Sequence, residues 1–273
     1  MRSSWRDCIT VKICVAGATG KMGIAVIKEA ISKGFQVVGA VEAAESSSIG
    51  KSLRELGICD SEARVVGPDM IRSATENADV YVTFTVPVAE VSNIPAVAGL
   101  GKRIVMGTTG FDDAQALSIR KAVVGKVPAV FSPNFSLGVN VLFKLARLLK
   151  VFPADYDVSI SEIHHTGKKD APSGTAKKLG EIISNVRGYS KTVYGREGIS
   201  PRKPGELEVA ALRIGGVPGI HDVIIAGPYE ALRIEHTAFS RNVFAQGAVF
   251  AADWISRQNE LKIFSMEDVL DLA

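Results

Sequence analysis

A stretch near the middle of the chain concentrates side chains that can bind anions and transfer protons. Residues 162–176 read EIHHTGKKDAPSGTA, with a histidine pair, a lysine pair and a Ser-Gly-Thr helix start. Imidazole and ammonium groups neutralise carboxylates and donate protons. The backbone N–H groups of Gly174 and Thr175, at the head of a helix, form a site for an anion such as a carboxylate. The stretch therefore predicts a site for a small polyanionic substrate.

Each of these groups also has a simpler explanation, which their clustering outweighs. A histidine at a strand end is usually a polar surface residue, Lys168 and Lys169 are usually solvated, and Ser173 is an ordinary helix cap. Zinc binding through His164 and His165 is disfavoured because adjacent residues of a strand point to opposite faces. We expect no metal, and the same alternation gives the two histidines different roles.

Three residues farther along the chain carry weaker signals. His221 and His236 stand on strand-like segments without a neighbouring cluster, so a structural role is favoured for both. Arg241 precedes the helix of the C-terminal segment. It either pairs with a substrate carboxylate or lies solvated at the helix start.

A second stretch with chemical meaning lies near the N-terminus. Residues 15–24 read VAGATGKMGI, between an apolar run and a helical pattern. Gly17 permits a tight turn, Gly20 lets a phosphate approach the backbone, and Gly23 lets the helix sit close to the strand. Strand, glycine turn and helix together lay a dinucleotide pyrophosphate on backbone N–H groups. The alternative is a structural glycine turn in another α/β domain.

The residue that ends the next strand favours the nucleotide interpretation. The apolar run at 35–41 ends in Glu42. A carboxylate at that place accepts hydrogen bonds from the hydroxyls of an adenosine ribose. We therefore expect a cofactor-dependent enzyme.

Two kinds of architecture must position these groups. The first half alternates strands and helices, which predicts a parallel sheet covered on both faces, with ligands bound beyond the carboxyl ends of its strands. In the second half, residues 157–164 alternate like a half-buried strand, and later strand-like runs predict an antiparallel or mixed sheet. Further strands are expected at 79–84, 102–106, 129–131, 207–214, 219–226 and 230–237, and helices at 89–100, 139–150, 175–186, 242–257 and 266–272.

The sequence therefore predicts an α/β fold with two domains. Residues 1–135 form a Rossmann-type dinucleotide-binding domain, to which residues 241–273 return. Residues 136–240 form a smaller α+β domain with a mixed sheet.

Composition excludes several functional classes. The chain has 273 residues, of which 47% are hydrophobic, and a scattered net charge of +3, which argues against nucleic-acid binding. No apolar run approaches the roughly 20 residues of a membrane helix, and the first residues lack the apolar core of a secretory signal. Three cysteines without metal-ligand spacing, with Cys14 expected to be buried, fit a reducing cytoplasm.

Residues 162–176 match every fixed place of the signature E-x-H-H-x-x-K-x-D-A-P-S-G-T-A. The chain thereby resembles the 4-hydroxy-tetrahydrodipicolinate reductases, the dihydrodipicolinate reductases of lysine and diaminopimelate synthesis. The resemblance extends over nearly the whole chain. Its other segments are 17–23, 84–85, 107–111, 134–140 and 240–241.

The resemblance implies a nicotinamide-binding N-terminal domain and a C-terminal domain that binds substrate and forms a homotetramer. Hydride would pass from NADH or NADPH to the dipicolinate ring, and loss of water would give tetrahydrodipicolinate. His164 would be the acid/base histidine and Lys168 the proton donor. Substrate carboxylates would be bound by His165, Gly174, Thr175 and Arg241. The cofactor would be held by Gly17, Ala18, Thr19, Gly20, Lys21, Met22, Glu42, Phe84, Gly107, Thr108, Thr109, Ser132, Pro133, Asn134 and Phe135.

Two departures from the family pattern bear on the cofactor. Ala43 stands where many relatives carry a basic residue, so a 2′-phosphate would meet Glu42 without that cation. We therefore expect NADH to be preferred over NADPH, with Lys21 as the only nearby basic candidate. Val86 stands where some relatives carry arginine, so a cofactor or gating contact of those relatives would be missing.

Two other functions compete with this one. Another two-domain dehydrogenase, such as an aspartate dehydrogenase or a homoserine-type enzyme, would share the nucleotide domain but not the loop at 162–176. A nucleotide-sensing regulatory protein would keep the fold without catalysis. The intact His164, Lys168 and Thr175 argue against it.

Overall fold

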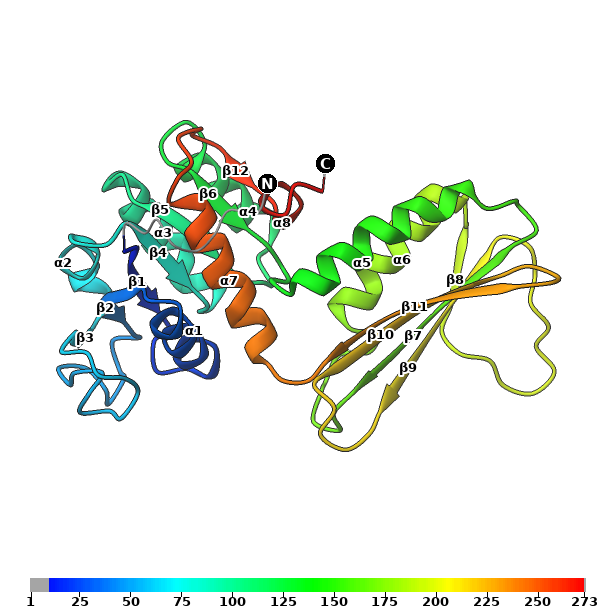
Figure 1. The fold of residues 1–273 in the computed structure, drawn as a ribbon, viewed down its shortest axis with the longest axis horizontal. Coiled ribbons are helices and arrows are strands. Elements are labelled where there is room, and N and C mark those ends of the chain that lie inside the picture. The colour runs from blue at the N-terminus through cyan, green and yellow to red at the C-terminus, as the bar shows by residue number, and fades with distance from the viewer. Residues whose placement is uncertain (1–9, 273) are drawn as a thin grey trace. The chain divides into compact units, whose positions relative to one another are not determined.

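The computed structural model describes residues 10–272, which form two compact units (Figure 1). The first unit runs to Phe135 and takes up the chain again from Phe244, and the second comprises Ser136–Val243. Residues 1–9, Cys8 among them, lie outside the described residues. Within residues 10–272, no helix is long and apolar enough to cross a membrane.

A parallel sheet forms the centre of the first unit. Its strand order is β12-β6-β5-β4-β1-β2-β3, and every neighbouring pair is parallel. The strands are β1 (Lys12–Ala16), β2 (Gln36–Val41), β3 (Val65–Val66), β4 (Val80–Thr83), β5 (Arg103–Met106), β6 (Ala129–Phe131) and β12 (Ile263–Phe264). The helices are α1 (Lys21–Ser32), α2 (Ile71–Thr75), α3 (Pro87–Gly99), α4 (Asp113–Val123), α7 (Asn242–Ile255) and α8 (Met266–Val269), with a 3-10 turn η1 (Pro68–Met70).

The central strands lie inside this unit because their residues are mostly apolar. All four residues of β4 are buried, and the last four residues of β1 are buried. Apolar strands of this kind need helices on both faces of the sheet, as the alternation of strands and helices predicts. The carboxyl ends of β1, β4, β5 and β6 therefore share one edge of the sheet.

The second unit is a mixed sheet with helices on one face. Its order is β11-β10-β7-β9-β8, with β10 antiparallel to both of its neighbours and the other pairs parallel. The elements are α5 (Leu137–Leu148), η2 (Leu149–Val151), β7 (Asp157–His164), α6 (Gly174–Arg187), β8 (Lys191–Val193), β9 (Glu206–Arg213), β10 (Gly219–Ala226) and β11 (Ala231–Ala238).

Alternation along the strands decides which side chains meet the helices of this unit. In β7 the residues Val158, Ile160, Glu162 and His164 are buried, while those between them are more exposed. Val158 and Ile160 pack with apolar residues of α5 and α6 in one core. Because successive side chains of a strand point to opposite faces, Glu162 and His164 lie on the same helix-covered face.

The predicted α/β fold, with a parallel sheet and a second, mixed sheet, is confirmed. Cys14 is fully buried, as predicted, and burial raises its pKa to about 12. Helix α3 begins at Pro87, two residues earlier than expected. The elements that were not predicted are short or polar, namely β3, β8, β12, α2 and α4.

Candidate active site

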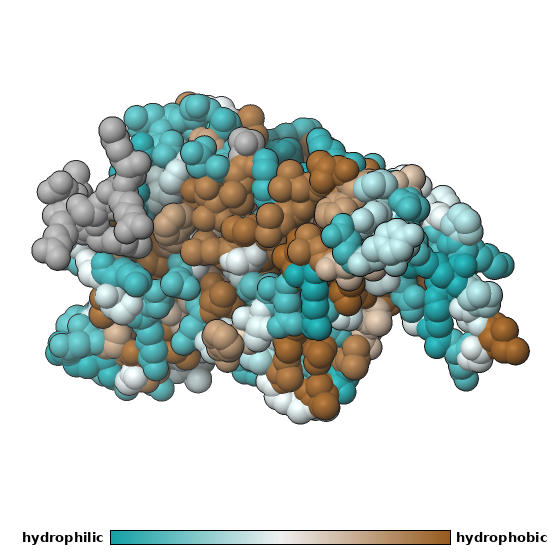
Figure 2. Space-filling view, turned by 45° about the vertical axis from the view of Figure 1, so that its right-hand side comes forward, coloured by the Kyte–Doolittle hydropathy of each residue, from teal (hydrophilic) through white to brown (hydrophobic). Residues whose placement is uncertain are grey.

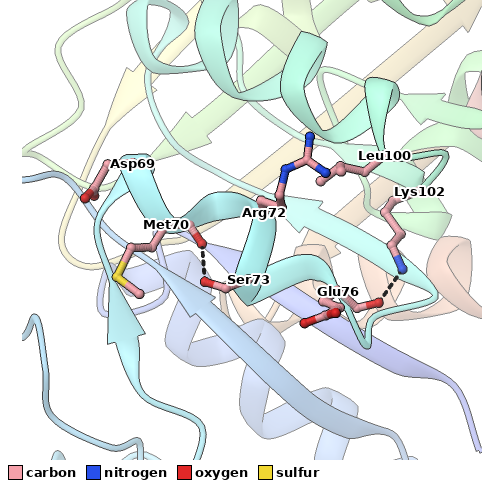
Figure 3. Close-up of a pocket in the computed structure, with 7 residues that line it drawn as sticks. All are labelled: Asp69, Met70, Arg72, Ser73, Glu76, Leu100 and Lys102. Carbon is pink, nitrogen blue, oxygen red and sulfur yellow. Dashed lines mark hydrogen bonds between the residues drawn. The ribbon is translucent and has the colours of Figure 1, made fainter.

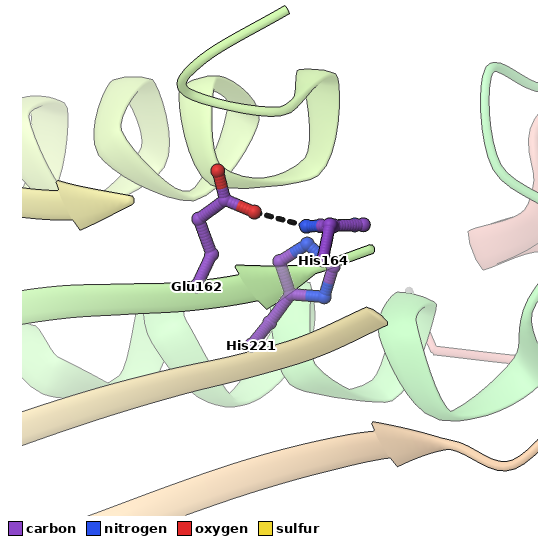
Figure 4. Close-up of side chains that lie close together, drawn as sticks. All are labelled: Glu162, His164 and His221. Carbon is purple, nitrogen blue, oxygen red and sulfur yellow. Dashed lines mark hydrogen bonds and ion pairs between the residues drawn. The ribbon is translucent and has the colours of Figure 1, made fainter. Parts of the chain in front are cut away.

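A buried carboxylate organises the end of strand β7. Glu162 is fully buried, and its Oε2 is hydrogen-bonded to Nδ1 of His164, as Figure 4 shows. Its Oε1 accepts hydrogen bonds from Arg213 Nη1 at 3.0 Å and from the backbone N–H of Ser173 at 3.2 Å. The carboxylate thus binds a strand end, a neighbouring strand and the start of α6 together.

Two further histidines join this cluster, contrary to the sequence-based expectation that they stand apart. The His221 ring lies 5.1 Å from the His164 ring, and the His236 ring lies 6.4 Å from the His221 ring, centroid to centroid. The cause is the strand register, which pairs His221 with Glu162 on one side and with His236 on the other. The sequence shows neither pairing, because strand order and register depend on the whole sheet.

Serine hydroxyls fix both of these additional rings. Ser173 Oγ lies 3.1 Å from His221 Nε2, and Ser136 Oγ lies 3.1 Å from His236 Nε2. Ser173 also caps α6 by accepting a hydrogen bond from the Ala176 backbone N–H. The head of α6 is therefore held against the histidine cluster.

Burial is the main influence on the charges of the three imidazoles. Desolvation lowers the pKa of His164, although the Glu162 carboxylate opposes the shift. Desolvation and the neighbouring histidines lower the pKa of His221 to about 3, and burial also lowers the pKa of His236. His221 is therefore neutral near pH 7. His164, the ring in contact with a carboxylate, is the one best placed to become cationic.

A glycine stands beside the second ring nitrogen of His164. A Cβ at position 219 would lie 3.0 Å from Nε2 of His164. With Nδ1 bound to Glu162, proton exchange with a substrate would take place at Nε2. Glycine at this position leaves that space open.

The predicted substrate-binding residues gather around the same strand end. Lys168 Nζ forms an ion pair with Asp170 at 2.8 Å, and Arg213 Nη2 donates to the Asp170 backbone carbonyl. Arg241 Nη2 lies 3.5 Å from Nε2 of His165. Gly174 and Thr175 form the first turn of α6, directly after the cap that contacts His221. The second unit thus groups several cationic donors with a helix N-terminus.

Sequence reasoning missed Arg213 and Ser136, and it assigned His221 and His236 a structural role without their place in this cluster. Glu162 was part of the recognised signature but received no role. Glu162, His164 and His221 place potential metal-ligand atoms within 4.8 Å of one another. The Glu162 carboxylate, however, already faces the Arg213 guanidinium, whose positive charge opposes a cation. The arrangement fits a carboxylate–imidazole–guanidinium network.

The glycine turn of the first unit has the close approaches that were predicted. A Cβ on Gly23 would lie 2.0 Å from the Gly17 carbonyl oxygen, so α1 can pack on the turn only with glycine there. Gly17 has a φ of 70°, which favours glycine. Gly20 caps α1 without any side-chain hydrogen bond. No side chain therefore caps the first N–H groups of α1, and N–H groups at the start of a helix can bind an anion.

A cavity of about 370 Å³ lies beside this turn. Its lining includes five of the predicted cofactor residues: Gly17, Thr19, Gly20, Glu42 and Phe84. The rest of the lining is Ala16, Val41, Ala43, Pro68, Thr85, Val86, Ala89 and Asn93, so the described lining holds one carboxylate and no lysine or arginine.

Glu42 already has partners within the chain. Its Oε1 accepts hydrogen bonds from the Thr19 backbone N–H at 2.7 Å and from the Thr19 hydroxyl at 2.8 Å. Its Oε2 accepts from the Ala43 backbone N–H at 3.3 Å. These bonds hold the carboxylate in place at the cavity.

The other predicted cofactor residues do not line this cavity. Lys21 is exposed at the start of α1, and Ala18 and Met22 flank it on the turn and the helix. The remaining predicted cofactor residues follow β5 and β6 at the shared sheet edge. There the Phe84 ring contacts the Phe135 ring edge to face, with 5.7 Å between the centroids. These remaining residues are Gly107, Thr108, Thr109, Ser132, Pro133, Asn134 and Phe135.

A second hollow of about 560 Å³ borders α2 in the first unit (Figure 3). Lys102 Nζ donates to the backbone carbonyl of Glu76 at 2.6 Å, and Ser73 Oγ donates to that of Met70 at 2.8 Å. These bonds stabilise the chain around α2. None of the predicted site residues lines this hollow.

Comparison with known proteins identifies the family. The models described as dihydrodipicolinate reductase, N-terminus and C-terminus, match residues 11–135 and 138–270. A 4-hydroxy-tetrahydrodipicolinate reductase of Methanosarcina barkeri is 42% identical over 271 residues, covering 96% of this chain and 100% of the relative. The reductase of Archaeoglobus fulgidus is 39% identical over 266 residues, with coverages of 96% and 100%.

Solved structures show the same fold. A dipicolinate-bound dihydrodipicolinate reductase from Paenisporosarcina sp. TG-14 has a TM-score of 0.74 at 23% identity, covering 94% of this chain and 98% of that one. An amine dehydrogenase from Mycobacterium smegmatis has a TM-score of 0.62 at 14% identity, with coverages of 93% and 94%. The fold is thus shared with other dehydrogenases, whereas the sequence signature and both family models agree on one assignment: the chain belongs to the dihydrodipicolinate reductase family.

Proposed function

We propose that this chain reduces 4-hydroxy-tetrahydrodipicolinate to tetrahydrodipicolinate in lysine and diaminopimelate synthesis. Family membership over nearly the whole chain supports the reaction. The observation that carries the mechanism is the Glu162–His164 pair beside Lys168 and the head of α6. This cluster combines a proton carrier with donors for two carboxylates.

The nicotinamide cofactor supplies the hydride, and the chain supplies the proton that leaves with the 4-hydroxyl as water. Glu162 holds Nδ1 of His164, so that Nε2 exchanges protons with the substrate. Lys168 is the proton donor. His165, Arg241 and the backbone N–H groups of Gly174 and Thr175 bind the substrate carboxylates, as the positive end of a helix dipole favours.

NADH oxidation in the presence of the product of dihydrodipicolinate synthase tests this proposal. Absorbance at the NADH wavelength should fall only when that product is supplied, and tetrahydrodipicolinate should appear in equal amount. A chain that binds NADH and shows no turnover would instead be a nucleotide sensor. Turnover with aspartate or homoserine-type substrates in its place would favour another dehydrogenase activity.

NADH is the preferred cofactor in this proposal. The described lining of the cavity presents Glu42 and no basic side chain, so the 2′-phosphate of NADPH would meet a carboxylate without a counter-charge. Lys21 is exposed and lies outside the lining. The ratio of kcat/KM for the two cofactors measures the preference. Equal or better efficiency with NADPH would contradict it, and Ala43→Arg should move the ratio toward NADPH.

The first unit binds the cofactor and the second binds the substrate and assembles a homotetramer. Hydrophobic residues are exposed on the face of the molecule in Figure 2. In the second unit, the register places Ile220, Ile163 and Leu212 in one row across three strands, on the sheet face opposite α5 and α6. Such an apolar row suits contact with another copy. Light scattering should give the mass of a tetramer, and Leu212→Glu should lower it.

A cytoplasmic location completes the proposal. The described cysteines, Cys14 and Cys59, are free thiols. Free thiols fit a reducing compartment. Fractionation of cells that produce the protein should recover it with cytoplasmic markers.

A further inference from the structure

One fully buried glutamate of the first unit has no role in the function described above. Glu90 lies in the first turn of α3 and has no exposed surface. A carboxyl group is rarely buried in this way without compensating hydrogen bonds or ion pairs, because desolvation of its charged form is costly. In the sequence, Glu90 is marked only as an acidic residue within a largely apolar helix.

Three threonine hydroxyls donate to a single oxygen of this side chain. Glu90 Oε1 accepts from Thr83 Oγ1 at 2.5 Å, from Thr85 Oγ1 at 2.5 Å and from Thr108 Oγ1 at 2.8 Å. Thr83 ends strand β4, Thr85 follows it, and Thr108 follows β5. Among the described residues, Oε2 has no hydrogen-bond partner. One oxygen atom therefore connects the ends of two neighbouring strands to a helix.

This network adjoins the proposed cofactor cavity. Thr85 lines the cavity, as do Ala89 and Asn93 on the same helix as Glu90. The Thr85 backbone N–H donates in turn to Thr108 Oγ1 at 3.0 Å. Because a hydroxyl has one proton, and Thr85 gives its proton to Glu90, that oxygen can present only an acceptor to a ligand.

We propose that Glu90 is a positioning residue of the cofactor cavity, whose Oε1 gathers the hydroxyls of Thr83, Thr85 and Thr108 and so fixes the segments after β4 and β5. The inference rests on the proposed function, since it assumes that this cavity binds the nicotinamide cofactor. A role in stability alone would predict that loss of Glu90 affects folding without changing the affinity of the folded protein for NADH.

Direct titration of the full-length protein with NADH, without substrate, tests this inference. Glu90→Met removes the acceptor at similar volume and should weaken NADH binding about tenfold, as expected for hydroxyls left without their partner. Glu90→Gln keeps one carbonyl oxygen and should restore most of that affinity. Glu76→Met is the matched control, because Glu76 belongs to the same unit but lines the other hollow. Its NADH affinity should stay at the wild-type value.

Steady-state kinetics provides the second readout. In Glu90→Met the KM for NADH should rise about tenfold, while the KM for the dicarboxylate changes by less than about twofold. A folded Glu90→Met with wild-type affinity would overturn the inference, as would a Gln variant as weak as the Met variant. If Glu90→Met does not fold, the NADH affinity of Thr85→Val is measured instead. Wild-type affinity in Thr85→Val would also overturn the inference.

These outcomes separate this inference from the proposed function. Absence of NADH binding by the wild-type chain would contradict the proposed function itself. Wild-type binding that is unaffected by any of the Glu90 and Thr85 variants would contradict only the role of Glu90.

Discussion

Acid should destabilise the fold through one buried histidine, because His221 must stay neutral in the folded chain. The residue is 4% exposed, and burial together with neighbouring histidines lowers its pKa to about 3. In the unfolded chain the same group binds a proton below about pH 6.5. Between these two values the unfolded state binds more protons than the folded state. The contribution of the neutral His221 to the free energy of unfolding is therefore fully present above about pH 6.5. It is lost as the pH falls toward 3.

The size of the effect follows from the difference between the two pKa values. Each pH unit within this window corresponds to about 1.4 kcal/mol. Acidification from pH 6.5 to pH 5 should thus remove about 2 kcal/mol of unfolding free energy through His221 alone. For a chain of this size that corresponds to a fall of about 4–8 °C in Tm.

Comparison of His221→Gln with the wild type isolates this contribution. Urea unfolding at pH 7 and at pH 5 should show that the variant loses about 2 kcal/mol less than the wild type on acidification. His165→Gln, a substitution at the partly exposed neighbour of His164, is the control and should behave as the wild type does. Equal acid sensitivity in wild type and His221→Gln would refute the reasoning.

Three further predictions concern the catalytic end of the second unit. Lys168→Ala should lower kcat by about 10²–10⁴-fold, as for loss of a general acid, and a wild-type kcat would remove Lys168 from the mechanism. Glu162→Gln removes a group that raises the pKa of His164 and removes the ion pair between Glu162 and Arg213. As the pH is raised, the activity of this variant should therefore decline at a lower pH than wild-type activity does, and its Tm should be lower. An unchanged pH–rate profile would contradict the role of the pair. Gly219→Ala places a methyl group 3.0 Å from His164 Nε2; it should reduce kcat more than it reduces Tm, and full activity would show that Nε2 needs no such space.

The sequence was sufficient for features that depend on local chemistry. The glycine turn, the apolar strands that follow one another in the first half and the alternation of β7 are all local patterns, and the structure contains them. Helix α4 could also have been predicted, because Asp112 and Gln115 form a capping box at its start. Strands of two or three residues, such as β3 and β12, carry too little pattern to be recognised.

The composition of the histidine cluster could not be predicted, because it depends on strand register. His221 meets Glu162, and Arg213 meets His164, only because β10 and β9 pair with β7 in one particular alignment. A shift by one residue would turn each of these side chains to the other face of the sheet. The Glu90 network has the same origin, since it joins residues at the ends of β4 and β5 that are distant in the sequence but adjacent in the sheet.

Isotope transfer measures the central claim most directly, namely that this chain delivers hydride from NADH to a cyclic dicarboxylate. NADH deuterated at C4 of the nicotinamide, on the face that is transferred, should give tetrahydrodipicolinate with one deuterium per molecule when the dihydrodipicolinate synthase product is supplied. Mass spectrometry of the product reads the outcome. NADH oxidation that leaves the product without deuterium, or NADH binding without any product, would contradict the account.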